Sequence, residues 1–240
     1  MSHVAFVAGA TGYTGREVVR TLVRRGIETV AHVRPDSPQL GLWRERFAVM
    51  GTQTDATPWN ADALAVTCTR WRPDLVFALL GTTRRRMARS GGRDSYSSVD
   101  FGLTVTLLEA AVRAVPKARF VYLSAVGVRG GQTRGYLGAR SRAEAAIRAS
   151  GLEFTIARPS FITGRDRDED RPLERFGAAA TDVALAVAAR LGARRLADRY
   201  RSTTNVALAD ALVRRALDPA AANRILEGTD LFGDIGGVRR

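Results

Sequence analysis

Three glycines near the amino terminus are spaced to hold a phosphate group. Gly9, Gly12 and Gly15 follow a short apolar run and open an amphipathic segment. In that context the first glycine permits a tight turn, the second lets the backbone approach a pyrophosphate, and the third lets a helix pack close to a strand. Exposed N–H groups at such a helix N-terminus attract anions. The spacing predicts a dinucleotide-binding loop, and the alternative is a tight turn with a purely structural role.

A second signal follows the next predicted strand, in the sequence AHVRPDS. A site that selects NAD usually has an acidic residue here, which binds the adenosine ribose and repels a 2′-phosphate. Arg34 occupies this position, and a guanidinium favours the 2′-phosphate of NADP. Asp36 could accept from the ribose instead if Arg34 points away. We therefore expect NADP(H) to be preferred over NAD(H).

Short apolar runs alternate with amphipathic segments along the first 160 residues, which indicates parallel strands joined by crossover helices. The runs LVFALL and FVYL are apolar throughout, as is typical of strands covered on both faces. Strands are predicted at residues 3–8, 28–33, 47–50, 75–80, 119–124 and 153–157. Helices are predicted at residues 14–25, 59–70, 95–114 and 137–150. These elements predict an α/β fold, a Rossmann doubly wound parallel sheet with helices on both faces.

The pattern changes after Pro159. A charged stretch, GRDRDEDRP, comes first, and helices are predicted at residues 173–199 and 205–217, with a short strand at 223–226. No linker rich in Gly, Ser or Pro separates this part from the rest. We expect a single domain over residues 1–240, in which residues 160–240 contribute a small C-terminal cap on the substrate side.

Charge and composition narrow the range of partners. The net charge is +13, but arginines are spread along the chain and Lys117 is its single lysine. This indicates a bias in composition rather than a basic stripe, so we do not expect nucleic acid as a partner. The densest cluster, residues 82–93, fits either a solvated loop or a surface that attracts an anionic ligand.

Several function classes are disfavoured by what the sequence lacks. It shows neither a secretion signal nor an apolar stretch of membrane-spanning length, so we expect a cytoplasmic protein. Cys68 has no second thiol with which to form a disulfide or a metal site. His3 and His32 stand singly near strand ends, where a structural role is expected, and no metal site is predicted.

An ordered set of motifs resembles a known superfamily over most of the chain. These are GATGYTG, LLGTTR, the pair Val99 and Asp100, FVYLSAVGV, YLGAR and ARPSFITG. The set resembles the extended or atypical short-chain dehydrogenase/reductase superfamily, and within it the NmrA-like and Tat-interacting-protein-like NAD(P)-binding branch. The resemblance implies a nicotinamide cofactor and oxidoreductase chemistry, but it names no substrate.

The same resemblance implies cofactor contacts at four places along the chain. They come from the glycine loop, the arginine after the second strand, the turn after the fourth strand beside the nicotinamide ribose, and the backbone that touches the nicotinamide carboxamide. The implied cofactor-binding residues are Gly9, Thr11, Gly12, Tyr13, Thr14, Gly15, Arg34, Gly81, Thr82, Arg158, Pro159, Ser160 and Phe161.

The implied catalytic residues depart from the family pattern at one position. Ser124 matches the serine that polarises the carbonyl oxygen, and Tyr136 matches the tyrosine that donates and recovers the hydroxyl proton. The family has a lysine four residues after the tyrosine, where this chain has Arg140. An ammonium near a phenol lowers the phenol's pKa from about 10, whereas arginine delivers its charge at a different distance and angle. Lys117 precedes the fifth strand, on the opposite edge of the sheet, and cannot substitute.

Two functions therefore stay open. The first is an NAD(P)-dependent reduction or oxidation of a small carbonyl or alcohol substrate, with Ser124 and Tyr136 as catalytic residues and Arg140 supporting Tyr136. The second is a redox sensor or a regulatory or assembly protein that binds NADP(H) but has weak or no activity. Arg84 fits the Thr-Thr-Arg of the family and would favour an anionic substrate. Monomer and homodimer are both compatible with the sequence.

Overall fold

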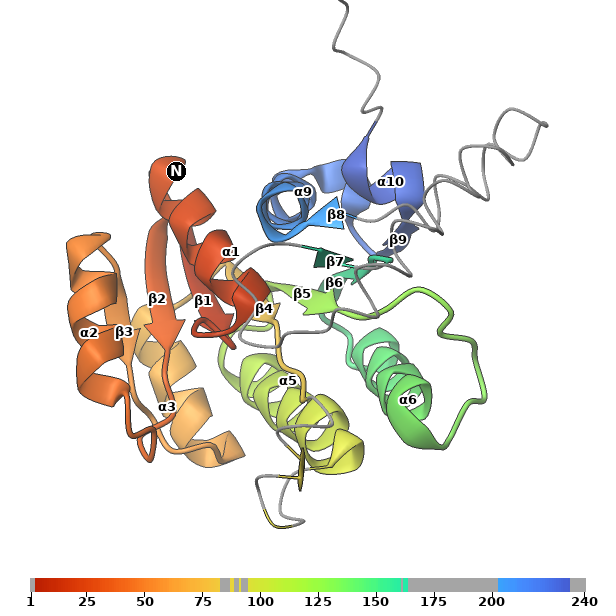
Figure 1. Cartoon of the computed structure of the whole chain (residues 1–240), viewed down its shortest axis with the longest axis horizontal. Coiled ribbons are helices and arrows are strands. Elements are labelled where there is room, and N and C mark those ends of the chain that lie inside the picture. Colours follow the sequence, from red (N-terminus) through yellow and green to blue (C-terminus); the bar gives the residue numbers. More distant parts are fainter. Residues whose placement is uncertain are drawn as a thin grey trace, which may run out of the picture.

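The computed structural model describes residues 3–82, 87–88, 91, 95–160, 162–163 and 203–233. Within these residues, seven parallel strands form one sheet in the order β3-β2-β1-β4-β5-β6-β9 (Figure 1). The strands are β1 (Val4–Ala8), β2 (Glu28–His32), β3 (Gln53–Asp55), β4 (Leu75–Ala78), β5 (Arg119–Leu123), β6 (Glu153–Arg158) and β9 (Arg224–Glu227). A separate two-stranded sheet pairs β7 (Ile162–Thr163) with β8 (Thr203–Thr204).

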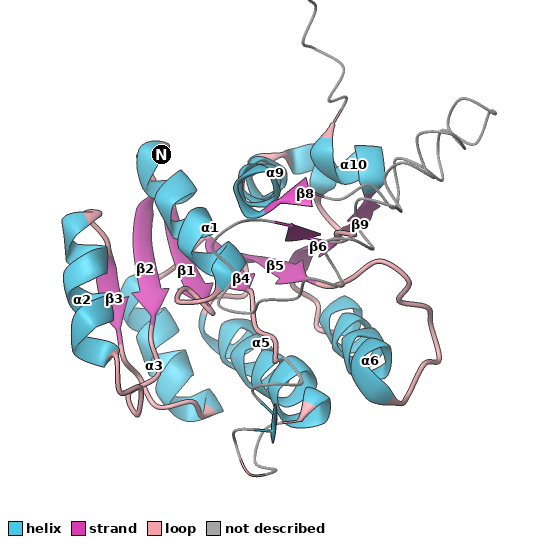
Figure 2. Cartoon of the chain, viewed as in Figure 1, coloured by secondary structure: helices cyan, strands magenta, loops and turns pink. Residues whose placement is uncertain are grey.

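Helices cover both faces of the sheet (Figure 2). They are α1 (Tyr13–Arg24), α2 (Leu40–Val49), α3 (Ala61–Trp71), the π-helix η1 (Tyr96–Gly102), α5 (Leu103–Ala114), α6 (Gly135–Ala149), α9 (Asn205–Leu217), the 3₁₀ helix η2 (Pro219–Ala221) and α10 (Gly228–Phe232). The residues of β1 alternate between two cores: Ala5 and Val7 pack with α1, α2 and α9, whereas Phe6 and Ala8 pack with α3, α5 and α6. The predicted doubly wound α/β fold is confirmed.

One predicted strand is wrong. Residues 47–50, expected as a strand, lie at the end of α2, and the third strand is β3 instead. The four-residue apolar run has no period of its own, but Trp43 and Phe47 are four residues apart and both buried, which places them on one helical face. Gly51, with a φ of +76°, then ends the helix in the left-handed conformation.

The helix predicted at residues 95–114 is present in two forms. Its first part is the π-helix η1, and only its second part, α5, is α-helical. Ser95 and Ser98 close the start of η1, because each side chain accepts a hydrogen bond from the other's backbone N–H, at 3.0 and 2.9 Å. π-Helical turns are rare and occur often at functional sites. Asp100, fully buried, lies in this segment.

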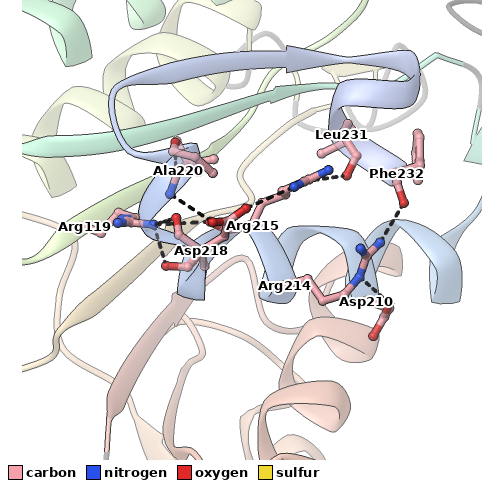
Figure 3. Close-up of polar contacts among 11 residues, drawn as sticks. Arg119, Asp210, Arg214, Arg215, Asp218, Ala220, Leu231 and Phe232 are labelled. Atoms are coloured by element: carbon pink, nitrogen blue, oxygen red, sulfur yellow. Dashed lines mark hydrogen bonds and ion pairs between the residues drawn. The ribbon is translucent and has the colours of Figure 1, made fainter. Parts of the chain in front are cut away.

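The C-terminal part of the described chain is joined to the sheet by strand pairing and by arginines. β9 extends the sheet beside β6, and α9 packs against α1. At the start of β5, Arg119 donates to the carbonyl oxygens of Ala216 (3.0 Å) and Asp218 (2.6 Å) at the end of α9 (Figure 3). Arg215 of α9 donates to the carbonyl of Leu231 in α10 at 3.2 Å. Cations at a helix C-terminus also complement its dipole.

The prediction of a cap formed by residues 160–240 remains a prediction. The helix expected at residues 173–199 lies outside the described residues, whereas the helix expected at 205–217 coincides with α9. In the part of the chain that is described, no helix combines the length and apolar character needed to cross a membrane.

Candidate active site

The glycine loop joins β1 to α1 with very close backbone contacts. Gly9 has a φ of +81°, and a Cβ added there would lie 2.4 Å from the carbonyl oxygen of Leu79. A Cβ on Gly15 would lie 2.1 Å from the carbonyl oxygen of Gly9. The N–H of Gly12 donates to that same oxygen at 2.9 Å. Only glycine fits at the first and third positions, as the predicted close approach of helix and strand requires.

The first turn of α1 offers its backbone N–H groups to an anion. Gly12 is the N-cap, so no side chain caps the helix, and the first turn holds no acidic residue. Gly12 is exposed, Thr11 and Tyr13 are half-buried, and Thr14 is buried. An uncapped helix start without a carboxylate suits the pyrophosphate of a dinucleotide, so the residues present fit this cofactor.

Arg34 lies on the exposed loop after β2. Its side chain is 49% exposed and its Nε lies 3.7 Å from Oδ1 of Asp36, which is more exposed still. A pair this exposed and this long is weak, so the guanidinium is available to a stronger anion. The two alternatives for the adenosine ribose, Arg34 and Asp36, therefore lie beside each other in the structure.

Tyr136, Arg140 and Glu144 follow one another along α6 at intervals of four residues, which puts them on one helical face. The Arg140 guanidinium carbon lies 5.2 Å from the centre of the Tyr136 ring. The ring of Tyr96, from η1, meets the Tyr136 ring edge to face at 5.4 Å between centroids. Tyr136, which is half-buried, is thus held between a cation and a second aromatic ring.

Arg140 is buried and bonded to three surrounding segments. Its Nη2 lies 2.8 Å from Oδ1 of Asp100 in η1 and donates to the carbonyl of Leu80, after β4, at 3.0 Å. Its Nη1 donates to the hydroxyl of Tyr122 at 3.1 Å and to the carbonyl of Leu123, both in β5. The side chain therefore ties together α6, η1 and the carboxyl ends of β4 and β5.

The charge on Arg140 is stabilised by its surroundings. Burial alone would lower the pKa of Arg140, but Tyr122, Tyr136 and Asp100 outweigh that effect and raise it. Burial raises the pKa of Tyr122 to about 12, in spite of the nearby guanidinium. The cation beside Tyr136 is therefore permanent over the physiological pH range.

Gly81 and Thr82, predicted to border the nicotinamide ribose, lie against this ion pair. A Cβ on Gly81 would come within 2.9 Å of Nη2 of Arg140. The backbone N–H of Thr82 donates to Oδ2 of Asp100 at 3.0 Å, and its hydroxyl is buried with no hydrogen-bond partner among the described residues. Arg84 lies outside the described residues.

Ser124, directly after β5, is held by a carboxylate. Its hydroxyl donates to Oε1 of Glu144 at 2.5 Å, and both side chains are buried. Arg158, at the end of β6, grips the same carboxylate with two nitrogens, Nε to Oε1 at 2.9 Å and Nη2 to Oε2 at 2.6 Å. Nη1 of Arg158 donates to Glu227 at the end of β9, also at 2.9 Å. Such two-pronged arginine–carboxylate pairs have fixed geometry.

The remaining predicted residues follow β6. The carbonyl of Pro159 accepts from the N–H of Val126 at 2.9 Å, which ties this segment to the turn after β5. Ser160 is half-buried, and Phe161 lies outside the described residues. Because all strands of the main sheet run parallel, the segments after β1, β2, β4, β5 and β6 meet at one carboxyl edge. The structure thus brings the described candidate residues to one side of the sheet.

Asp100, Glu144 and Glu227 were missed as site residues when the sequence was read alone. Glu144 had a readable signal, because it continues the four-residue spacing of Tyr136 and Arg140. Asp100 was part of a recognised motif but had no partner assigned. No local pattern pointed to Glu227, which reaches Arg158 only because β9 pairs with β6.

His32 has the structural role expected of it, and Cys68, which was assigned no role, lies in the core. The Nε2 of His32 bonds the carbonyl oxygen of Thr57 at 2.9 Å, and its ring packs edge-on against Trp59. Cys68 is buried, and burial raises the pKa of its thiol to about 11. Among the residues that the structure describes, no group of three or more His, Cys, Asp or Glu side chains could hold a metal ion.

The fold and the glycine loop together are those of a dinucleotide-binding α/β protein of the Rossmann class. The chain belongs to the NAD(P)H-binding family, whose model matches residues 9–194. This membership confirms the nicotinamide-binding family that the motifs resemble.

Proteins with similar sequences or structures include a mitochondrial protein, a reductase and an epimerase/dehydratase. The chain is 29% identical over 176 residues to protein fmp52-1, mitochondrial, of Aspergillus terreus, an alignment that covers 72% of each chain. It is 28% identical over 161 residues to ceramide reductase of Caulobacter vibrioides, covering 67% of this chain and 47% of the relative. Among solved structures, a Bacillus halodurans protein assigned as an NAD-dependent epimerase/dehydratase is similar with a TM-score of 0.65 at 19% identity, over 95% of both chains.

Proposed function

We propose that this protein is an NADPH-dependent oxidoreductase that interconverts a small carbonyl compound and its alcohol. The observation that carries the proposal is the α6 face on which Arg140 lies 5.2 Å from the Tyr136 ring, beside β5, the strand that Ser124 directly follows. A nicotinamide bound at the carboxyl edge would supply the hydride. Tyr136 would give its hydroxyl proton to the carbonyl oxygen, so that carbonyl and reduced cofactor become alcohol and oxidised cofactor, and the phenolate would recover a proton from solvent.

Arg140 acts in this proposal as a positioning residue. Its guanidinium keeps a fixed positive charge against the Tyr136 ring and stabilises the phenolate that forms during proton transfer. In the family motif a lysine ammonium has this position. The contacts of Arg140 with Asp100, Leu80 and Tyr122 fix the guanidinium in this position, whereas a lysine side chain there would be more flexible.

The cofactor would lie along the carboxyl edge from the glycine loop to the segment after β6. Its pyrophosphate would meet Gly12 at the start of α1, and its adenosine 2′-phosphate would meet Arg34. The exposure of Arg34 and its long distance to Asp36 support NADP(H) over NAD(H). The other carried-over contacts, Thr11, Tyr13, Thr14, Gly81, Thr82, Arg158, Pro159, Ser160 and Phe161, belong to the same proposal.

A second function has an observation in its favour. The nitrogens Nη1 and Nη2 of Arg140 already bond protein acceptors, and the residue is only 5% exposed. The family lysine reaches the hydroxyls of the nicotinamide ribose, whereas a buried guanidinium that already bonds protein acceptors does not. An NADP(H)-binding sensor or assembly protein with little turnover would need the cofactor loop but not that contact.

The substrate, the cellular location and the oligomeric state are proposed only as classes. One relative is named ceramide reductase, which supports a reductase activity. An anionic group on the substrate would bind Arg84. We propose further that the protein belongs to the NmrA-like branch, is cytoplasmic, and is a monomer or a homodimer. The Aspergillus relative is named mitochondrial, so fractionation of cells that express the tagged protein is the relevant check of location.

NADPH fluorescence and turnover separate the two functions. Both predict that the protein binds NADPH, but only the oxidoreductase oxidises it in the presence of members of a panel of aldehydes, ketones and quinones. Tyr136→Phe should then reduce turnover by about 10²- to 10⁴-fold without weakening NADPH binding. Tyr96→Phe, which removes a hydroxyl from the neighbouring ring, is the matched control and should keep its activity. NADPH binding without turnover on any panel member would favour the sensor.

A further inference from the structure

The buried hydroxyl of Ser124 has one proton, and the structure shows where it goes. It is donated to Oε1 of Glu144 at 2.5 Å, within the range of a strong hydrogen bond from a hydroxyl to a carboxylate. A serine hydroxyl has a single hydrogen and two lone pairs. With that hydrogen directed at Glu144, the oxygen of Ser124 has only lone pairs left for any other group.

Glu144 is held in place to accept this hydrogen bond. Three donors converge on its two oxygens: the Ser124 hydroxyl, Nε of Arg158 and Nη2 of Arg158. Three donors on two oxygens are the arrangement of an ionised carboxylate, which only accepts. Both Ser124 (3% exposed) and Glu144 (2% exposed) are removed from water, so solvent does not compete for these bonds.

The network also fixes the position of Glu144. Arg158 reaches it from the end of β6 and reaches Glu227 at the end of β9 with its third nitrogen, at 2.9 Å. α6 brings Glu144 to the sheet one helical turn after Arg140, whose own bonds fix that helix against Leu123. Glu144 cannot turn without breaking its three hydrogen bonds, and the Ser124 hydroxyl cannot turn without breaking its bond to Glu144.

We propose that Glu144 is a positioning residue that makes Ser124 a hydrogen-bond acceptor toward the substrate. This rests on the proposed function and deepens it. In the family resemblance the serine donates to the carbonyl oxygen. Here the alcohol form of the substrate donates its hydroxyl to Ser124, whereas the carbonyl form depends on Tyr136 as its hydrogen-bond donor. The site therefore makes one more hydrogen bond to the alcohol than to the carbonyl.

Proton NMR of the full-length protein tests the assignment without a substrate. A hydroxyl proton in a short, buried bond to a carboxylate exchanges slowly with water and resonates downfield of ordinary hydroxyls. The wild type should show such a resonance. Ser124→Ala, which leaves the pair of Glu144 and Arg158 intact, should lose it, and Ser124→Thr should restore it. Glu144→Gln should lose it too, whereas Glu153→Gln, which alters a carboxylate paired with Arg119 at the other end of the sheet, should keep it.

Addition of NADP⁺ tests the loaded site. The resonance should persist when the cofactor is bound, because Ser124 continues to donate to Glu144. Loss of the resonance with NADP⁺, its absence from the wild type, or its survival in Ser124→Ala would overturn the proposal. Failure of NADP⁺ to bind would instead overturn the proposed function, and the resonance of the free protein would still decide whether Glu144 takes the proton.

Turnover gives a second readout where the panel contains a substrate. Because the carbonyl depends on Tyr136 and not on Ser124, Ser124→Ala should lower the rate of carbonyl reduction by less than 10-fold, well short of the about 10²- to 10⁴-fold expected for loss of the acid. A loss in Ser124→Ala as large as that in Tyr136→Phe would show that Ser124 donates to the carbonyl and would contradict the proposal.

Discussion

The buried ion pair of Arg140 and Asp100 makes a prediction about stability whose size can be worked from the structure. The two side chains are 6% and 0% exposed, and Nη2 lies 2.8 Å from Oδ1. Removing one partner of a buried pair leaves the other charge without compensation and costs about 3–5 kcal/mol. For a domain of this size, each kcal/mol lowers Tm by about 2–4 °C. Arg140→Ala should therefore lower Tm by about 6–20 °C, as measured by circular dichroism.

An exposed ion pair in the same protein provides the control. Arg113 lies 2.7 Å from Asp62, but both side chains are more than half exposed. Solvent screens such a pair, which contributes about 0–1 kcal/mol. Arg113→Ala should shift Tm by at most about 4 °C. If Arg140→Ala shifted Tm by no more than Arg113→Ala does, the description of Arg140 as a buried clamp would be wrong.

Arg140→Lys separates the charge from the clamp. A lysine has one nitrogen, whereas the acceptors of Arg140, which include Leu80 and Tyr122, are shared between two. Each buried acceptor left without a partner costs about 1–3 kcal/mol, so the lysine variant should be less stable than the wild type but more stable than Arg140→Ala. A gain in NADPH-dependent turnover in Arg140→Lys would show that the arginine attenuates the native site.

Three further predictions concern the glycine loop, Arg34 and a buried histidine. Gly15→Ala should abolish NADPH binding in a fluorescence titration, because its Cβ would meet the Gly9 carbonyl oxygen at 2.1 Å, and unchanged affinity would contradict the loop assignment. Arg34→Ala should weaken NADPH binding while leaving NADH binding nearly unchanged, and an equal loss for both would refute the 2′-phosphate contact. Burial lowers the pKa of His32, so the unfolded chain takes up its proton first as pH falls below about 6.5. The stability contributed by the neutral imidazole should be complete above that pH and be lost as pH falls through the lower pKa of the folded state. Tm should therefore fall less steeply with decreasing pH in His32→Gln than in the wild type. Parallel Tm profiles of the two proteins would contradict this role of His32.

Local sequence signals predicted most of the fold. β1, β2, β4, β5 and β6 were predicted within about two residues, because each is a short apolar run between turn signals. Gly26 and Gly151 adopt the positive φ that is typical of glycines just beyond helix ends. The run at residues 47–50 failed because four apolar residues fit a strand and a buried helix end equally well, and only the contact of Trp43 and Phe47 with the core decides between them.

The candidate site was less readable, because its chemistry depends on contacts between distant segments. Asp100 and Arg140 are separated by a helix and a strand, so no spacing rule pairs them. The bond between Ser124 and Glu144 forms only when α6 packs beside the end of β5. The sequence showed that arginine replaces the family's lysine, but which groups that arginine meets is a property of the fold.

A crystal structure with NADP⁺ bound would test the central claim most directly. The account predicts the pyrophosphate at Gly12, the 2′-phosphate at Arg34, and the nicotinamide ring beside Ser124 and Tyr136, with Arg140 still bonded to Asp100. A cofactor bound elsewhere, or a nicotinamide that points away from Tyr136, would contradict it.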